Sequence, residues 1–487
     1  MNMKNFNIFS WIAGLVIIAV MSEPALSQDV SASSKEEITI NDKGSVQKWR
    51  TSTGVTDFNV EMRGKIELTD DDRDIKSISD DGYLEINKTV FGSKRTIVIE
   101  SLGGGKMKKE YYEGRSKMDW NTQGQKWLSE ILPDLVHTST IGAEGRVNRF
   151  YKQGGANAVL DEIEEIDSDY IKSYYGKLLL DKPIPASDMS NVITKLADEI
   201  NSDYYLSTLL KDSMSKMLIN AESANAFFTA TEKVTSDYYK SVVLKEALKK
   251  YSASPAQVKL ILQSASSINS DYYLSVVLTS LLEDADVKDE SLSELVNVSQ
   301  KIDSDHYRTQ VLARALKKND LSKTLVKNIV NAVADVESDY YKTEVLNSMA
   351  ERASIDPDLQ NQIVSVLNNS VGSDYYASVT YNKILKHQKL SDDSFKNLIL
   401  AAGELNSSTY AADVLQNAAT KTLSANQLVY TLKAAENIDS DHYLTTVLQA
   451  LAPQVKNADS SVKDAYRQAA KKISSETYYG RALRAVE

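Results

Sequence analysis

The chain has 487 residues, of which 42% are hydrophobic and none is cysteine, and its net charge is -11 at pH 7. An acidic chain repels the phosphate backbone of nucleic acids, so we expect no nucleic-acid partner. The lack of cysteine excludes disulfides, a thiol nucleophile and a lipid-modified cysteine. The hydrophobic content, with sustained periodicity, also excludes a chain that is disordered throughout.

The amino-terminal segment has the features of an export signal. Lys4 precedes an apolar stretch over residues 8–21, and small residues lie one and three positions before Gln28. We therefore expect residues 1–27 to be a signal peptide that is cleaved after Ser27, which predicts a periplasmic or secreted protein without a membrane span. An uncleaved anchor is the alternative, but the stretch is shorter than the roughly 20 residues that a bilayer requires.

Residues 37–115 are predicted to form a small antiparallel β-domain of five to seven strands. β-branched and aromatic residues cluster or alternate there, with interruptions at residues 80–82, 91–93 and 103–105. The interruptions are rich in glycine and aspartate, so we expect hairpin turns at these positions. The preceding serine-rich segment, residues 28–36, lacks apolar periodicity, and we expect a flexible leader there.

After a helical linker or cap over residues 116–155, the rest of the chain repeats a motif with a period close to 34 residues. The motif reads Ile-Asn-Ser-Asp-Tyr-Tyr at Ile268–Tyr273. Its aspartate, or the residue in its place, occurs ten times, at Asp169, Asp203, Asp237, Asp271, Asp305, Asp339, Asp374, Ser408, Asp441 and Glu476. A period of this length indicates stacked units, because one unit cannot bury its own apolar face.

Each motif carries the signals of a helix start. The residue two positions before the aspartate, such as Asn201 or Asn269, favours an N-cap. With the N-cap there, the apolar residue before it would occupy N′ and the second tyrosine N4, as in a hydrophobic staple. A second helix is expected in each repeat. Residues that favour a helix start occur at five places, which are Ser254-Pro255, Ser322, Asp356-Pro357, Ser391 and Ser424.

The predicted fold is mainly α, a right-handed α-solenoid of about ten 34-residue helical hairpins over residues 156–487, preceded by the small antiparallel β-domain. The tetratricopeptide pattern also has 34 residues, but glycine is nearly absent from these repeats and no proline recurs at the closing turn. The array is therefore closer to the HEAT or armadillo type.

Catalytic and metal-binding patterns find little support. The acidic run Asp70, Asp72 and Asp74 lacks the glycine of a calcium loop, and the glycines before Lys106 lack the context of a phosphate loop. His306 and His442 replace the first tyrosine of motifs four repeats apart, so they cannot share a metal. We expect no enzymatic activity, no cofactor and no metal.

The tyrosines of the motif remain as the candidate binding residues. The first tyrosine and the small residue three positions later lie on one helix face, so ten copies predict a long stripe. Its structural interpretation is that serine permits close helix packing and that the tyrosine hydroxyls bond to the next repeat. Its functional interpretation is a partner-binding surface for a protein, an extended peptide or a glycan, with candidate residues Tyr204, Asp237, Tyr238, Asp271, Tyr272, Asp305 and Tyr340.

The motif Ile-x-Ser-Asp-Tyr-Tyr-x-Ser-x-Val-Leu resembles repeats in little-characterised secreted bacterial proteins, some of which are similar to regions that accompany membrane metallopeptidases of the β-lactam-sensor class. The resemblance covers roughly residues 80–487 and includes Gly82–Ile86, Gln125–Pro133 and Ile141–Val147. The chain lacks the His-Glu-x-x-His motif of the peptidase, so the resemblance transfers no catalytic residue. It implies an accessory or sensing role in the cell envelope.

Two functions therefore remain open. The first is a non-catalytic periplasmic or secreted scaffold that binds protein partners through the solenoid, in envelope sensing or signalling. The alternative is an enzyme that acts on cell-wall or polysaccharide substrates through carboxylates near the junction of the β-domain and the helices, at Glu110, Glu113 and Asp119.

Overall fold

The chain forms two compact units, one up to Gly145 and one over Arg146–Glu487. The computed structural model describes residues 33–41, 44–52, 55–251, 254–283, 287–318, 321–352 and 355–487. The expected signal peptide, and residues 28–32 of the expected leader, lie outside the described residues.

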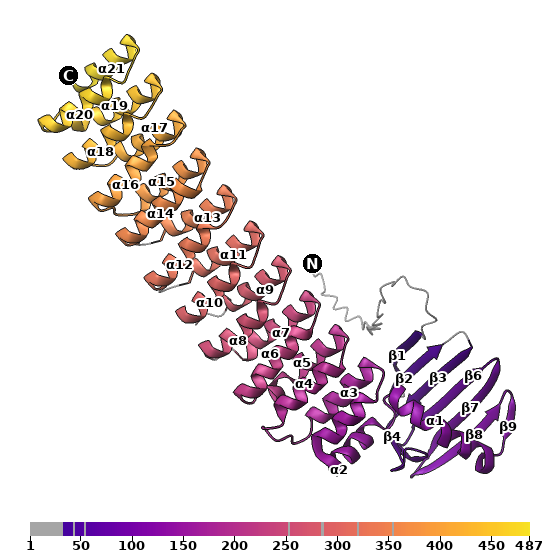
Figure 1. Ribbon diagram of the computed structural model, residues 1–487. Coiled ribbons are helices and arrows are strands. Elements are labelled where there is room, and N and C mark those ends of the chain that lie inside the picture. Colours follow the sequence, from indigo (N-terminus) through magenta and orange to yellow (C-terminus); the bar gives the residue numbers. More distant parts are fainter. Residues whose placement is uncertain are drawn as a thin grey trace, which may run out of the picture. The chain divides into compact units, whose positions relative to one another are not determined.

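The first unit contains a seven-stranded antiparallel sheet in the order β1-β2-β3-β6-β7-β8-β9 (Figure 1). Its strands are β1 (Ser33–Asn41), β2 (Gly44–Ser52), β3 (Thr56–Arg63), β6 (Tyr83–Val90), β7 (Ser93–Gly103), β8 (Lys106–Glu113) and β9 (Ser116–Met118). A separate two-stranded hairpin, β4 (Ile66–Leu68) and β5 (Ile75–Ile78), is inserted between β3 and β6. The expectation of a flexible leader is wrong for residues 33–36, because they pair with β2 as part of β1.

Two of the three hairpin turns expected in this unit are confirmed, whereas the turn expected at residues 80–82 connects β5 to β6, which lie in different sheets and do not pair. Phe91 and Gly92 connect β6 to β7 with φ angles of 50° and 81°, and Gly104 and Gly105 connect β7 to β8 with φ angles of 61° and 77°. Two successive positive φ angles give the backbone twist that a two-residue hairpin needs. These turns set the register of β6, β7 and β8.

One face of the sheet is apolar and packs against a helix. The row Trp49, Val60, Ile86, Ile97 and Tyr111 runs in register across five strands, and each of these side chains is buried. The helix α1 (Gln125–Thr138), which follows a π-helical turn η1 (Trp120–Gly124), belongs to the same core through Trp127, Leu128, Ile131, Leu132, Leu135 and Val136. The segment expected as one helical linker or cap, residues 116–155, is therefore split between the two units. Its first helix, α1, belongs to the first unit, because α1 buries its apolar face on the sheet.

The second unit is an α-solenoid. The helix α2 (Ala143–Glu164) leads into it, and all ten motifs then begin a helix. These motif helices are α3 (Asp169–Leu180), α5 (Asp203–Met217), α7 (Asp237–Lys250), α9 (Asp271–Leu281), α11 (Asp305–Leu316), α13 (Asp339–Ala350), α15 (Asp374–His387), α17 (Ser408–Ala419), α19 (Asp441–Val455) and α21 (Glu476–Val486).

A second helix follows each motif helix except α21 within the described residues. These second helices are α4 (Met189–Glu199), α6 (Ala221–Lys233), α8 (Pro255–Ala265), α10 (Asp289–Ser299), α12 (Lys323–Ala334), α14 (Pro357–Ser370), α16 (Asp392–Gly403), α18 (Ala425–Ala435) and α20 (Ser460–Ala470). The array thus consists of nine complete hairpins and a final helix.

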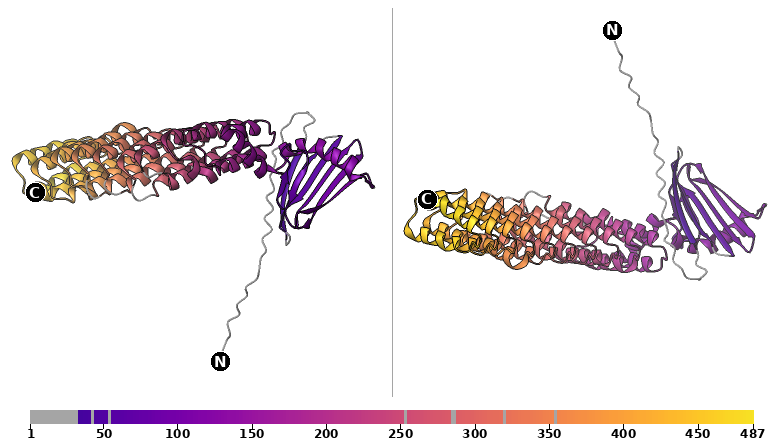
Figure 2. Two further views of the ribbon diagram at one scale, coloured as in Figure 1. Left: turned by 90° about the horizontal axis from the view of Figure 1, so that it is seen from below. Right: turned by 90° about the horizontal axis from the view of Figure 1, so that it is seen from above.

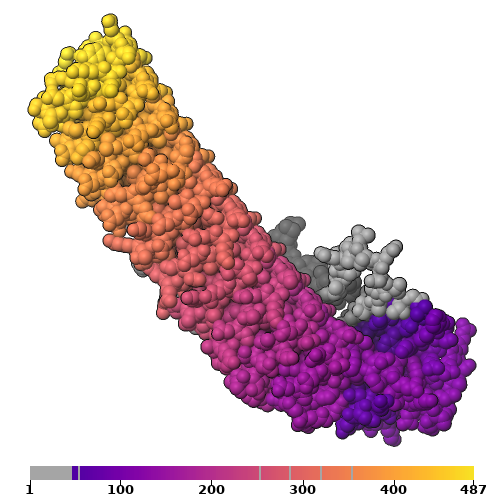
Figure 3. All heavy atoms as spheres, viewed as in Figure 1, coloured from indigo at the N-terminus to yellow at the C-terminus, as the bar shows by residue number. Residues whose placement is uncertain are grey.

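The hairpins stack so that motif helices pack on motif helices and second helices on second helices. Figures 1 and 2 show the two resulting layers, with the odd-numbered helices from α3 to α21 along one side. The surface of this unit continues without a break from one repeat to the next (Figure 3). Apolar side chains fill the space between the layers, as Val277 and Leu278 of α9 and Ile261 and Leu262 of α8 illustrate by being fully buried.

The starts of the second helices are confirmed, whereas the expected starts of the motif helices are wrong by one residue. Ser254, Ser322, Asp356, Ser391 and Ser424 each accept a hydrogen bond from the backbone N–H three residues later, as an N-cap does. In the motif helices the N-cap is instead the serine directly before the aspartate, for example Ser202, and its side chain makes no capping bond. The second tyrosine consequently lies at N3 and not at N4.

Candidate functional site

The motif aspartates join each repeat to the next one. Asp271 accepts hydrogen bonds from the backbone N–H groups of Asp303 (3.1 Å) and Ser304 (2.7 Å) at the start of the following motif helix. Equivalent bonds reach the next N-cap serine from Asp169, Asp203, Asp237, Asp305, Asp339, Asp374 and Asp441, at 2.6–2.8 Å. The starts of eight motif helices are thus capped from the preceding repeat, so the serine there needs no local capping bond.

The first tyrosines of the motif form a continuous aromatic row on the motif helices. The ring of Tyr272 lies 5.1 Å from that of Tyr273 in its own repeat and 5.8 Å from that of Tyr307 in the next, and both contacts are edge-on. The same pair of contacts is made by Tyr204, Tyr238, His306, Tyr340 and Tyr375. We call the six residues Tyr204, Tyr238, Tyr272, His306, Tyr340 and Tyr375 the aromatic stripe.

The tyrosines of the aromatic stripe are half exposed although each contacts two second tyrosines of the motif. Their exposed fractions are between 41% and 51%, whereas the second tyrosines of the motif are more deeply packed. Within the described residues, the hydroxyl groups of Tyr238, Tyr272, Tyr340 and Tyr375 make no hydrogen bond, so the expectation that they bond to the next repeat's turn is wrong. The stripe tyrosines are joined to the next repeat by ring contacts and not by hydrogen bonds of their hydroxyl groups.

The small residue of the motif has the expected structural role. Ser241 and Ser275 are buried, and each donates its hydroxyl to the carbonyl of the tyrosine three residues earlier, at 2.7 Å. The hydroxyl is therefore satisfied within its own helix, and the small side chain leaves room for the neighbouring helix.

The row is interrupted in the eighth repeat. There Ser408 stands in place of the aspartate and Thr409 in place of the first tyrosine. Among the described residues no carboxylate reaches the backbone of Ser440 at the start of the next motif helix, and the ring contacts resume only at His442, which meets Tyr443 and Tyr478. The aromatic stripe therefore ends with Tyr375, whose last contact is Tyr410.

The structure separates the seven candidate binding residues into two groups. The four tyrosines are exposed side by side along the stripe, but the carboxylates of Asp237, Asp271 and Asp305 are engaged with the backbone of the next repeat. The cross-repeat bond of the aspartates was missed from the sequence. The recurring interval of 33 or 34 residues between each aspartate and a later serine was the signal that could have revealed it.

Charges near the stripe are distributed unevenly. None of the motif aspartates has a lysine or arginine partner among the described ion pairs, and Asp303, Glu337 and Asp439 add exposed acidic side chains two positions before a motif aspartate. The basic side chains of the motif point elsewhere, since Lys240 is buried and donates to the carbonyl of Ser267 in the next turn. The stripe thus has an acidic border whose carboxylates form no ion pair with a lysine or arginine in the described part of the chain.

The three carboxylates of the alternative enzyme hypothesis do not converge. Glu110 and Glu113 lie three residues apart in β8, so their side chains point to opposite faces of the sheet. Hydrogen bonds from the ammonium groups of Lys117 and Lys108 lower the pKa of Glu110 to about 2. Asp119 accepts hydrogen bonds from the hydroxyl and the N–H of Thr122, which lower its pKa and cap η1.

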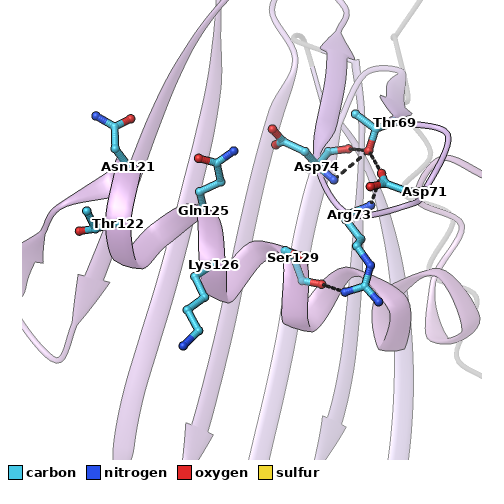
Figure 4. Close-up of a pocket in the computed structure, with 9 residues that line it drawn as sticks. All are labelled: Thr69, Asp71, Arg73, Asp74, Asn121, Thr122, Gln125, Lys126 and Ser129. Carbon is cyan, nitrogen blue, oxygen red and sulfur yellow. Dashed lines mark hydrogen bonds between the residues drawn. The ribbon is translucent and has the colours of Figure 1, made fainter.

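A polar cleft of about 450 Å³ lies beside α1 in the first unit (Figure 4). Its lining residues are Thr69, Asp71, Arg73, Asp74, Asn121, Thr122, Gln125, Lys126 and Ser129. Both carboxylates are engaged, Asp71 with Thr69 (2.6 Å) and Asp74 with Lys109 (2.8 Å). The cleft offers amide, hydroxyl and cationic groups to a polar molecule, and its lining residues include no histidine.

The acidic loop at this cleft is held by internal bonds. Across the described residues, no group of three or more histidine, aspartate or glutamate side chains has an arrangement that could hold a metal ion. A search of the same residues for a helix with the length and apolarity to cross a bilayer finds none.

Comparisons with known proteins leave the chain without a named relative. No family model matches it, and no curated protein matches it. Solved structures that match include a computationally designed self-assembling cyclic homo-oligomer, with 13% identity over 68% of this chain and 92% of that chain and a TM-score of 0.11. A circular tandem repeat protein with a novel repeat topology matches with 9% identity over 75% of this chain and 78% of that chain (TM-score 0.17). The exomer cargo adaptor complex matches with 9% identity over 83% and 84% of the two chains (TM-score 0.15). At such TM-scores these likenesses carry no argument.

Proposed function

We propose that this protein is a non-catalytic scaffold of the periplasm or extracellular space that binds a protein partner along the aromatic stripe, in envelope sensing or signalling. The observation that carries the proposal is the half exposure of the five tyrosines of the aromatic stripe. Tyrosine offers a large apolar contact area with a polar tip, and exposed aromatic patches are typical of binding surfaces. The proposed location rests on the expected signal peptide.

Photo-crosslinking within the cell envelope tests this proposal. A photoreactive phenylalanine analogue replaces Tyr272 on the stripe, or Lys259, an exposed residue on α8 in the other layer, as the matched control. We expect a discrete protein adduct from position 272 and none from position 259.

The specificity of the adduct is checked with two substitutions elsewhere on the stripe, Tyr238→Thr one repeat before Tyr272 and Tyr340→Thr two repeats after it. Threonine is the residue that the eighth repeat already has at this position, as Thr409, so the helix start tolerates it. We expect the adduct at position 272 to disappear while circular dichroism shows unchanged helicity. An adduct that persists in this variant, or that forms equally at position 259, would contradict the proposal.

A further inference from the structure

We propose, on the basis of the function proposed above, that the occupant of the aromatic stripe is an extended, lysine- or arginine-rich polypeptide segment that places one basic side chain on each repeat. The inference concerns the chemistry of the partner and the spacing of its residues. It is derived from the charge that borders the stripe, from the orientation of the rings and from the period of the stack.

The first argument is charge complementarity. Each repeat from Asp203 to Asp374 has a carboxylate directly beside its residue of the aromatic stripe, and no lysine or arginine forms an ion pair with these carboxylates in the described part of the chain. Asp303 and Glu337 extend the acidic border on exposed positions. A row of uncompensated negative charge attracts a cationic chain and repels an acidic one.

The basic side chains of the same helices do not neutralise this border. Lys240 donates to the carbonyl of Ser267, Lys342 donates to the carbonyl of Ser370, and Arg308 donates to the carbonyl of Asp335. These cations are held between repeats by backbone acceptors, and Lys240 and Lys342 are buried. The exposed carboxylates of Asp303 and Glu337 are therefore available to a partner, while the motif aspartates, which accept backbone N–H groups of the next repeat, add negative charge beside the rings.

The second argument is the exposed aromatic surface. The rings of the stripe contact their neighbours in the row edge-on, as Tyr238 does with Tyr239 (5.0 Å between ring centroids) and with Tyr273 (5.9 Å). About half of the surface of each stripe tyrosine still faces solvent. A guanidinium or ammonium group placed over such a ring gains roughly 0.5 to 1 kcal/mol from the cation–π interaction at an exposed site. The free hydroxyl groups can in addition bond to a peptide backbone.

The third argument is the period. Packed helices are about 8 to 10 Å apart, so successive rings of the stripe are separated by about one helix diameter. A polyproline II segment has three residues per turn and rises about 3.1 Å per residue, so it repeats every 9 Å or so. A basic residue at every third position of an extended segment would therefore meet a new ring of the aromatic stripe on each repeat, beside the negative charge of that repeat's motif aspartate.

The test is a titration of the full chain with fluorescent peptides of about twelve residues, built on an Arg-Pro-Ser period. One matched peptide has citrulline in place of arginine, and a second has the same composition with the arginines grouped at one end. We expect the periodic basic peptide to bind about tenfold more tightly than the citrulline peptide, and more weakly as salt increases. The grouped peptide should bind less tightly than the periodic one.

Two variants of the protein locate the binding. The triple substitution Tyr238→Thr, Tyr272→Thr and Tyr340→Thr should weaken binding about tenfold or more, since three cation–π contacts are lost. The pair Asp303→Asn and Glu337→Asn, which introduces the residue found at the same position as Asn201 and Asn269, should weaken it about threefold. The control pair Glu290→Gln and Asp393→Asn removes exposed charges from second helices and should leave affinity unchanged.

The outcomes separate this inference from the proposed function. Equal binding of the arginine and citrulline peptides, or binding of a neutral glycan but of no peptide, would overturn the inference while the crosslink at position 272 could still stand. Binding that is lost equally in the control pair would also overturn it, because attraction to the general negative charge would then suffice. Loss of the crosslink result alone would remove the proposed function itself.

Discussion

Asp271 illustrates how a single residue links the sequence period to the stack. Its carboxylate caps the next motif helix by accepting hydrogen bonds from the N–H groups of Asp303 and Ser304. This cap can form only where another copy of the motif follows at a fixed distance along the chain. The acidic charge also lies at the start of α9, where the helix dipole favours it. One side chain thus stabilises its own helix and the start of the following one.

Replacing this carboxylate should weaken the junction between two repeats. Asp271→Ala leaves two N–H groups without their charged acceptor, and we expect a loss of about 1.5 to 3 kcal/mol in local stability. Hydrogen exchange at the amide of Ser304 should become at least about tenfold faster. The matched control is Asp303→Asn, because that side chain is exposed and unbonded, and it should leave the exchange rate unchanged.

The eighth repeat allows the opposite experiment. Ser408→Asp introduces the carboxylate that every earlier repeat has, and its geometry should let it accept the N–H of Ser440. We expect a gain of about 1 kcal/mol and slower exchange at Ser440. Asn406→Asp adds the same charge at an exposed position and serves as the control, so an equal gain there would show that net charge alone is responsible.

Glu110 gives a pH dependence with a defined sign. Its folded pKa is lowered to about 2 by the hydrogen bonds from Lys117 and Lys108, below the value near 4.3 of an unfolded glutamate. The bonds therefore stabilise the first unit above pH 4.3, and this contribution is lost as the pH falls toward 2. Urea unfolding of Glu110→Gln should show a smaller drop in stability than wild type over that interval, and identical drops would contradict the assignment.

The helix starts show what could be predicted at the level of single residues and what could not. The N-caps of the second helices were predictable because Ser254 or Asp356 acts locally, on an N–H three residues away. The N-caps of the motif helices were misplaced by one residue because their N–H groups are satisfied by a carboxylate from another repeat, and local rules cannot include it. By contrast, the sequence assigned the second tyrosine of each pair to the packed side of the helix and the first to the stripe, and the exposed fractions agree.

At the level of elements, amphipathic patterns predicted the helices well but not their partners. The apolar positions of α1 are plain in the sequence, yet only the structure shows that they pack on the sheet with Trp127 against Tyr111, at 5.5 Å between ring centroids. The pattern shows that a face is buried and does not show what buries it. The flexible leader was misjudged for a related reason, since β1 is held by pairing with β2, which local sequence does not reveal.

Gly403 marks the closest approach between second helices of neighbouring repeats. A Cβ atom added there would lie 2.7 Å from the carbonyl oxygen of Ala434 and 2.9 Å from its Cα atom, so backbone would have to move. We expect Gly403→Ala to cost about 1 to 3 kcal/mol, seen as a lower melting temperature by circular dichroism. Gly480→Ala is the control, because an added Cβ there meets nothing nearer than 4.0 Å, and equal losses would refute the steric explanation.

At the level of the whole molecule, the repeat number and the solenoid architecture were accessible from the period alone. Function was less accessible, because the same tyrosines satisfy two requirements. Their rings join successive repeats, as Tyr340 and Tyr376 do at 5.9 Å, and their exposed sides form a surface. The sequence pattern alone does not show how much of each tyrosine is used in packing and how much stays exposed.

The stack itself makes the last prediction. Each hairpin contacts mainly its immediate neighbours, so removing residues 271–304, one full period, should bring Asp305 directly after Ser270 and restore every class of contact at the new junction. We expect a protein with unchanged mean residue ellipticity whose solenoid is about 8 to 10 Å shorter in small-angle scattering. The control deletion of residues 271–287 removes α9 but keeps α10, whose apolar side then lacks its partner, and it should aggregate. If the full-period deletion aggregated as well, the repeats would be coupled over more than nearest neighbours, and the additive description of the solenoid would have to be abandoned.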